Sequence, residues 1–239
     1  MSGVDMRLSL AGAQSKIALS YDRENKKFYL PSSDKVTNVI LKPPIQGVSK
    51  TSEYDTVYNE FFIMRLASKI GINVPYVDVC VIEDLPVFMI ERYDRVQFSD
   101  GDWCRLHQED FCQAISIVPE KKYQNQGGPS FEDCNNLIEK HSTFPIVDRL
   151  KILESFIFNY LIGNNDAHGK NFSMLHEIEE IENGHITGRK FLPQITPFYD
   201  LLSVAVYDGY SKKMAMNIGG EYKPNFVFER HWELSLIHI

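Results

Sequence analysis

The sequence predicts an α+β protein of two lobes, a small β-rich amino-terminal lobe and a mostly helical carboxy-terminal lobe. Two observations predict this division: alternating or β-branched apolar runs gather in the first 93 residues, and apolar residues at helical spacing dominate from residue 94 onward. The predicted bounds are 1–93 for the first lobe and 94–233 for the second. Residues 234–239 are set apart as a candidate non-native tail.

The first lobe is predicted to be a small sheet that carries one helix. The segment 56–70 has apolar residues at helical spacing, and Gly71 and Pro75 follow it as stop signals. Lys42 stands at the end of a β-branched run that precedes this helix. The predicted strands are 17–21, 28–30, 36–41, 77–82 and 86–91.

The second lobe is predicted to hold helices over 108–115, 131–141 and 147–162. The last is the strongest, because Leu150, Leu153, Ile157 and Leu161 lie at helical spacing and Gly163 follows its end. Between the helices, 123–130 is rich in Asn, Gln, Gly and Pro and is predicted to be a loop. A strand is predicted over 191–195, and the acidic segment 177–183 is expected to be a solvated excursion.

Composition excludes several classes of protein. A formal net charge of −7 argues against autonomous nucleic-acid binding, which needs a surplus of Lys and Arg on one face. The four cysteines form no CxxC pair and are typical of reduced thiols in a cytoplasmic protein. The sequence shows no signal-peptide or membrane-spanning pattern, although export by a dedicated apparatus would leave no mark in it.

The most informative segment, 163–171, follows the strongest predicted helix directly. Asp166 and Asn171 have the Asp-x4-Asn spacing of a kinase catalytic loop, in which the Asp accepts the proton of the substrate hydroxyl and the Asn binds magnesium. His168 stands where a cation or a hydrogen-bond donor could meet the transferred phosphoryl group. An ordinary turn is the alternative, since Asn and Gly favour turns.

Two further features fit the same chemistry. Asp200 is a candidate for the second carboxylate that holds the metal; the alternative is a cap for a helix beginning near Leu201. Lys42 stands eighteen residues before Glu60 on the following helix, the order of the kinase lysine and its glutamate partner. The alternative for Lys42 and Glu60 is that each is a solvated surface residue.

A loop of small residues near the amino terminus could bring backbone N–H groups close to phosphates. Its alternative is a frayed terminus. The candidate binding residues there are Ala11, Gly12, Ala13, Gln14 and Lys16. Taken together, the order of small-residue loop, strand lysine, helix glutamate, strand pair, helix, Asp-x4-Asn and Asp is that of the two-lobed protein kinase fold, which predicts an ATP-dependent phosphotransferase.

Several motifs also resemble the HipA-like kinases, the toxin halves of bacterial toxin–antitoxin systems. The resemblance runs from about Ser9 to about Ile218, and the combination of motifs is specific although no single one is. The motifs are SLAGAQSK from Ser9, Asn59-Glu60, GINVP from Gly71, IERYDR from Ile90, LHQEDF from Leu106, NDAHGKN from Asn165 and TPFYD from Thr196.

The resemblance implies a Ser/Thr protein kinase that transfers the γ-phosphate of ATP to an aminoacyl-tRNA synthetase and halts translation. It implies a helix-turn-helix antitoxin as partner, so that any DNA contact is indirect. By carry-over, Asp166 is the catalytic base, Asn171 and Asp200 hold Mg²⁺, and Lys42 contacts phosphates. Adenine would bind at the junction between the lobes, and a loop serine would be autophosphorylated; the residues implied are Glu91, Tyr93 and Ser9.

The sequence departs from the family in two respects and leaves two alternatives open. One departure is that the chain ends early, with residues 234–239 following no family pattern. Only eight residues precede Ser9, which resembles the shorter, HipT-like branch in which a separate small protein supplies a missing subdomain. A small-molecule phosphotransferase of the aminoglycoside type also has a His two residues after its catalytic Asp. The other alternative is a catalytically silent corepressor that binds an antitoxin.

Overall fold

A computed structural model describes residues 15–32, 36–47, 52, 55–98, 101–182, 185–208 and 210–236. The chain divides into two compact units. Unit 1 comprises residues 1–61 and 76–92, and unit 2 comprises residues 62–75 and 93–239. No helix in the described part of the chain is long and apolar enough to cross a membrane.

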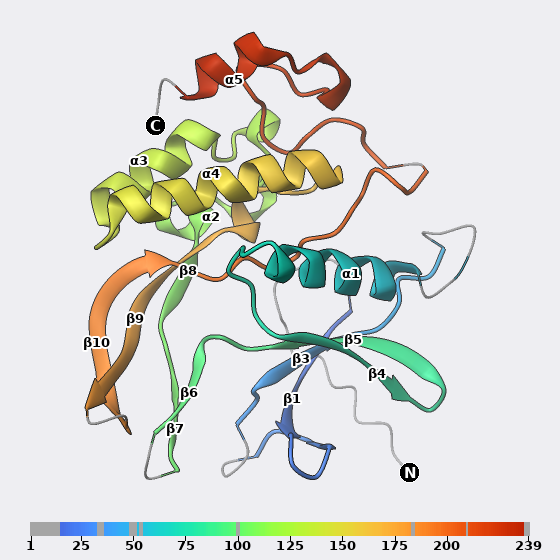
Figure 1. Cartoon of the computed structure of the whole chain (residues 1–239), viewed down its shortest axis with the longest axis vertical. Coiled ribbons are helices and arrows are strands. Elements are labelled where there is room, and N and C mark those ends of the chain that lie inside the picture. Colours follow the sequence, from blue (N-terminus) through green and yellow to red (C-terminus); the bar gives the residue numbers. More distant parts are fainter. Residues whose placement is uncertain are drawn as a thin grey trace. The chain divides into compact units, whose positions relative to one another are not determined.

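Unit 1 is built on an antiparallel sheet of five strands in the order β2-β1-β3-β5-β4 (Figure 1). All five strands agree with the predicted segments to within a few residues, because alternating β-branched runs bounded by turn residues leave little choice of structure. The strands are β1 (Ile17–Asp22), β2 (Lys27–Tyr29), β3 (Val39–Lys42), β4 (Val77–Ile82) and β5 (Leu85–Glu91).

The core of unit 1 includes a cluster of apolar side chains on β1, β3 and β5. Its buried members are Leu19, Val39, Leu41, Val87 and Met89. Successive residues of a strand point to opposite faces, so Lys42 lies on the face opposite to Leu41. The helix predicted over 56–70 forms as α1 (Asp55–Lys69), with an acidic residue in its first turn. Its residues 55–61 belong to unit 1 and its residues 62–69 to unit 2.

Unit 2 holds the remaining helices. The helix α3 (Phe131–His141) has the predicted bounds, and Ser130 caps it through a capping box with Asp133. The helix α4 (Pro145–Ile162) begins two residues earlier than predicted and packs beside α3 (Figure 1). Proline is favoured in the first helical turn, where its missing N–H costs nothing.

The prediction of a helix over 108–115 was wrong in its first half. Residues Gln108–Asp110 form the strand β8, and only Phe111–Ala114 form the helix α2. Asp110 caps that helix, because its side chain accepts from the Gln113 N–H at 2.9 Å. The helix therefore starts after Asp110.

The acidic segment 177–183 was not predicted to be a strand. Its residues 177–182 lie in β9 (Ser173–Glu182), which pairs with β10 (His185–Ile195) in a sheet of order β10-β9-β8. Charges on the neighbouring strand compensate the acidic run, as in the 3.0 Å pair of Arg189 and Glu177. A further hairpin, β6 (Arg95–Gln97) with β7 (Trp103–Arg105), was not predicted.

The helix α5 (Glu229–Leu236) includes the first residues of the segment 234–239 that the sequence sets apart. Its Ser235 hydroxyl accepts a hydrogen bond from the Gly219 N–H at 2.8 Å. Residues 237–239 lie outside the described part of the chain.

A buried carboxylate joins α4 to β10. Asp148 is fully buried and accepts hydrogen bonds from the Ser142 hydroxyl at 2.6 Å, the Ile195 N–H at 3.0 Å and the Lys151 ammonium group at 2.9 Å. A buried charge is tolerated only when hydrogen bonds and a counter-charge replace its hydration. Asp148 therefore fixes α4, and the segment that follows it, against the sheet.

We predict that Asp148→Ala lowers the free energy of unfolding by about 3 kcal/mol, because it leaves the buried Ile195 N–H without a partner. Asp148→Asn should cost clearly less, since its amide oxygen still accepts from Ile195. Urea unfolding of both variants and wild type measures the difference. Equal stability of Asp148→Ala and wild type would contradict the role given to this carboxylate.

Candidate functional site

The predicted catalytic loop begins where α4 ends. Gly163 ends the helix with φ 67° and ψ 37°, in the left-handed region that glycine adopts without strain. A Cβ atom here would lie 2.6 Å from the Ala205 Cβ atom, so glycine also permits close packing against residues 203–205. The left-handed backbone of Gly163 therefore sets the direction in which the loop leaves the helix.

The side chain of Asn164 connects two of the predicted site residues. Its Oδ1 atom accepts from the Asp166 N–H at 3.3 Å, and its Nδ2 atom donates to the Asp200 carbonyl at 3.3 Å. The same Nδ2 atom donates to Asn159 Oδ1 on α4 at 2.7 Å. Asn164 thus brings together Asp166 and Asp200, which lie 34 residues apart in the sequence.

Asp166 is held by a tyrosine that the sequence analysis missed. The Tyr123 hydroxyl donates to Asp166 Oδ1 at 2.5 Å. Burial, and then the hydrogen bond to Asp166, raise the pKa of Tyr123, so the phenol stays protonated and remains a donor. Tyr123 lies in a segment predicted only as a loop, 43 residues before Asp166, and no local pattern marks it.

His168 lies beside this pair. Its ring contacts that of Tyr123 edge-on, with the centroids 5.3 Å apart, and its Nδ1 atom is buried without a hydrogen-bond partner among the described residues. Burial is the largest effect on the His168 pKa and lowers it, although the charge of Asp166 opposes the shift. The neutral ring is therefore favoured, and it offers a hydrogen-bond donor rather than a positive charge.

The loop closes on Asn171. Its Nδ2 atom donates to the Asp166 carbonyl at 3.4 Å, and its N–H donates to the His168 carbonyl at 2.9 Å. Gly169 donates its N–H to the Lys122 carbonyl at 3.2 Å. A Cβ atom on Gly169 would lie 2.3 Å from Pro129 Cγ, so only glycine fits there.

Asp200 has an unusual backbone. Its φ of 56° is left-handed, a conformation that costs a non-glycine residue about 1–2 kcal/mol but that Asp tolerates better than most residues. The helix expected near Leu201 is not formed, so the helix-cap alternative for Asp200 was wrong. The hydroxyl of the preceding Tyr199 bonds to Ser173 Oγ at 2.6 Å and donates to the Lys170 carbonyl at 3.1 Å, which fixes the segment against the loop.

In unit 1, Lys42 and Glu60 form the ion pair that their order in the sequence predicts. The Lys42 ammonium group lies 2.7 Å from Glu60 Oε1, and both side chains are buried. Lys42 also lies over the Phe88 ring, 5.7 Å from its centroid. The interpretation of these two residues as solvated surface charges was wrong.

The residues predicted to contact adenine make contacts within their own units. Glu91 pairs with Arg23, whose guanidinium group stacks over the Tyr76 ring 4.8 Å from its centroid. The Tyr93 hydroxyl donates to Gln108 Oε1 at 2.6 Å, and its ring stacks on that of Tyr199. These contacts leave the adenine role of Glu91 and Tyr93 a prediction.

Part of the predicted nucleotide loop lies outside the described residues. This applies to Ser9, Ala11, Gly12, Ala13 and Gln14. Lys16 is described and is half-buried, directly before β1. Their roles also stay predictions.

The motif from Leu106 to Phe111 supports the catalytic loop. Leu106 is buried, and Asp110 caps α2 and lies 3.6 Å from the Lys170 ammonium group of the loop. The motif therefore positions α2 and β8 against the loop.

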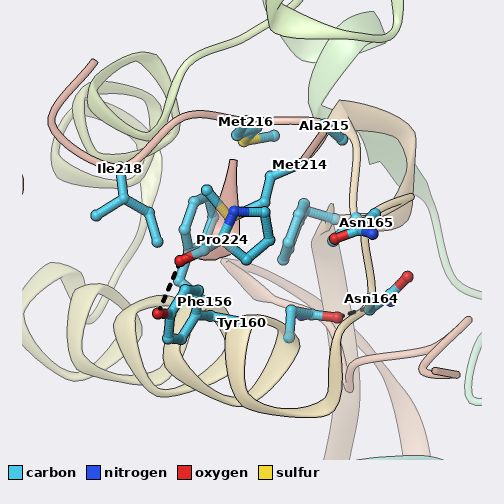
Figure 2. A pocket seen from close by; sticks show the side chains of 12 residues that line it. Phe156, Tyr160, Asn164, Asn165, Met214, Ala215, Met216, Ile218 and Pro224 are labelled. Carbon is cyan, nitrogen blue, oxygen red and sulfur yellow. Dashed lines mark hydrogen bonds between the residues drawn. The ribbon is translucent and has the colours of Figure 1, made fainter. Parts of the chain in front are cut away.

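A small apolar cavity lies behind the loop. Figure 2 shows Asn164 and Asn165 on one side of it, with Tyr160 of α4 and residues Met214 and Pro224 around the rest. Its volume of about 30 Å³ corresponds to about one water molecule, far below the roughly 300 Å³ or more of a ligand pocket. The cavity therefore belongs to the packing that supports the loop.

The fold, the buried lysine–glutamate pair and the loop with its adjacent aspartate define a protein of the kinase-like class. The chain belongs to the family described as the HipA-like C-terminal domain, whose family model matches residues 8–236. This confirms the resemblance seen in the sequence.

Two known proteins and one solved structure illustrate the similarity. The chain is 46% identical to the protein Y4mE of Sinorhizobium fredii, over 90% of this chain and 46% of that protein. It is 31% identical to the serine/threonine-protein kinase toxin HipA of Shewanella oneidensis, over 93% of this chain and 49% of that protein. The structure of the Shewanella HipA, in complex with HipB and operator DNA, matches with a TM-score of 0.77 at 29% identity and covers 99% of this chain and 53% of that chain. This chain thus spans about half the length of these relatives.

We predict that Gly169→Ala lowers the free energy of unfolding by about 1–3 kcal/mol, because the added methyl group overlaps the Pro129 ring. Gly188→Ala is the matched control. Its Cβ atom would meet only the flexible Glu180 side chain, 3.2 Å away, and it should change stability by less than about 0.5 kcal/mol. Thermal unfolding measures the stability of both variants. An equal loss of stability would show that the loop shifts enough at Gly169 to accommodate a methyl group.

Proposed function

We propose that the chain is an ATP- and Mg²⁺-dependent Ser/Thr protein kinase toxin. The observation that carries the proposal is the Asn164 side chain, which binds both the Asp166 backbone and the Asp200 backbone. A kinase needs a base at the substrate hydroxyl and a carboxylate at the metal, held at a fixed separation. A turn without function needs no such connection between residues so distant in the sequence.

The oxygen donors fit magnesium. Mg²⁺ prefers carboxylate and carbonyl oxygens, and Asp200 and Asn171 offer one carboxylate and one amide. The Asn171 Nδ2 atom already donates to the Asp166 carbonyl, so the ligand available to a metal is its Oδ1 atom. When bound, the ion would supply positive charge to the phosphates of ATP.

The base in this proposal is Asp166. Its Oδ1 atom accepts from Tyr123, which leaves Oδ2 for a substrate hydroxyl and fixes the direction in which the carboxylate points. His168 would donate a hydrogen bond to the transferred phosphoryl group, since its neutral form is favoured. Tyr123 is then a positioning residue that acts through Asp166.

The phosphate-binding role falls to Lys42. The ion pair with Glu60 holds the Lys42 ammonium group in one position, and both side chains are buried. We further propose that Ala11, Gly12, Ala13, Gln14 and Lys16 contact the phosphates, and that adenine binds near Glu91 and Tyr93.

The proposed substrate and partners are those that the family resemblance implies. We propose that the substrate is an aminoacyl-tRNA synthetase and that a helix-turn-helix antitoxin restrains the kinase in the cytoplasm. The assembly of the Shewanella relative with HipB and operator DNA supports an antitoxin as partner. Labelled ATP added to a cell lysate with the purified chain would identify the phosphorylated protein.

We predict that Asp166→Asn reduces phosphoryl transfer by about 100-fold or more while ATP affinity changes little, because a base acts at the transition state. Asp200→Ala should weaken Mg²⁺-dependent ATP binding more, since a metal ligand acts in the ground state. Radiolabel transfer and calorimetry with MgATP measure the two effects. Equal ATP affinities for the two variants would overturn the assignment of Asp200.

We also predict that incubation with MgATP places phosphate on Ser9 and lowers ATP affinity. A phosphoserine adds about −1.5 to −2 charge, three residues before Gly12 in the predicted phosphate loop. Mass spectrometry and calorimetry test this in wild type, Ser9→Ala and the control Ser2→Ala. Phosphate found only on other residues, or modified protein that binds ATP as tightly as before, would remove Ser9 from regulation.

A further inference from the structure

Two histidines and a glutamate gather on the sheet of unit 2, outside the residues assigned to phosphoryl transfer. His107 directly precedes β8, Glu109 lies on β8, and His176 lies on β9. One potential ligand atom of each lies within 4.8 Å of those of the other two. Among the described residues this is the one such group of His, Cys, Asp or Glu. We propose that this histidine cluster binds a zinc ion.

The register of the strands creates the cluster. Glu109 pairs with Met174 and Gln108 with Leu175, so the ladder continues with His107 opposite His176. The His176 N–H donates to the His107 carbonyl at 2.9 Å, which fixes this pairing. Residues two apart on a strand share a face, so Glu109 lies on the same face as His107.

The side chains are close to a metal-binding arrangement. His176 Nε2 and Glu109 Oε2 are 2.8 Å apart, and the two imidazole rings stack with their centroids 5.1 Å apart. Ligand atoms around a tetrahedral zinc ion lie about 3.4 Å from one another, given bonds of about 2.0–2.2 Å. Side-chain rotations that move each ligand atom by about an ångström would therefore bring the three atoms to these separations. Zinc would replace the hydrogen bond between His176 and Glu109, and the neutral His176 ring would then carry its proton on Nδ1.

The ligand types select the ion. Two imidazole nitrogens and one carboxylate suit zinc, whereas magnesium and calcium prefer oxygen ligands throughout. Three protein ligands leave a fourth position, and His107 is exposed, so an ion can enter from solvent.

Neighbouring groups hold the ligands in place. The His107 N–H donates to Glu177 Oε2 at 3.1 Å, and Arg189 neutralises that carboxylate. The Phe191 ring stacks on that of His176 with the centroids 6.3 Å apart. The ring stacking restricts the orientation of the His176 imidazole before the metal arrives.

The ion would join two strands that border the predicted catalytic loop. The strand β8 ends at Asp110, which pairs with Lys170 of the loop, and β9 begins at Ser173, two residues after Asn171. Cross-linking β8 and β9 should stabilise unit 2 without entering the chemistry. The proposal therefore does not depend on the kinase function.

Calorimetric titration of the metal-free full chain with zinc chloride tests the proposal. His107→Gln/His176→Gln should weaken zinc binding by about 100-fold or more, since loss of even an outer partner of a metal ligand costs about 10- to 100-fold. His141→Gln/His185→Gln is the matched control, because it removes two exposed histidines outside the cluster. Its zinc affinity should stay at the wild-type value. Equal zinc affinity of the two double variants would overturn the proposal.

A second measurement needs no variant. Cobalt(II) in place of zinc should give wild-type protein intense visible absorption typical of tetrahedral coordination, and zinc should remove it. Zinc should raise the midpoint temperature of thermal unfolding of the wild-type protein. It should raise that of Glu109→Ala much less. Absence of both the absorption and the shift in wild type would show that His107, Glu109 and His176 form only a hydrogen-bonded, stacked group.

Discussion

The candidate site depends on the amide of one buried asparagine. Asn164 accepts from the backbone of Asp166 and donates to that of Asp200 and to the side chain of Asn159. An amide group can do this because it offers a donor and an acceptor on the same rigid plane. Aspartate would lack the donor, and leucine would lack both. The relation between helix α4, the loop and the following aspartate therefore rests on the chemistry of this side chain.

The surroundings of the loop are built to keep that amide in place. Asp148 fixes α4 against β10, Tyr199 binds the Lys170 carbonyl, and Gly169 allows Pro129 to approach closely. Each contact comes from a different element, so the loop geometry is determined by several independent constraints. A site that must hold a base and a metal ligand to within a fraction of an ångström requires such redundancy.

Each of the two units holds its own set of polar and charged groups. Unit 1 holds a buried ammonium–carboxylate ion pair, in which Lys42 is the residue proposed to contact phosphates. In the proposed kinase, the carboxylates and the amide of unit 2 would hold a metal ion and accept a proton. The Shewanella HipA structure covers nearly this entire chain and is about twice as long.

The sequence by itself determined the elements with strong periodicity and the residue pairs with fixed spacing. It predicted the strands of unit 1, the helices α3 and α4, the Lys42–Glu60 pair and the Asp-x4-Asn loop, because these patterns are local or follow a known order. It missed Tyr123 and Asn164, and it misassigned Gln108–Asp110 and the acidic part of β9. Those features arise from contacts between residues tens of positions apart, such as the Tyr123–Asp166 hydrogen bond and the pairing of β8 with β9. Only the tertiary structure decided them, since hydrogen bonds across such separations leave no periodic trace in the chain.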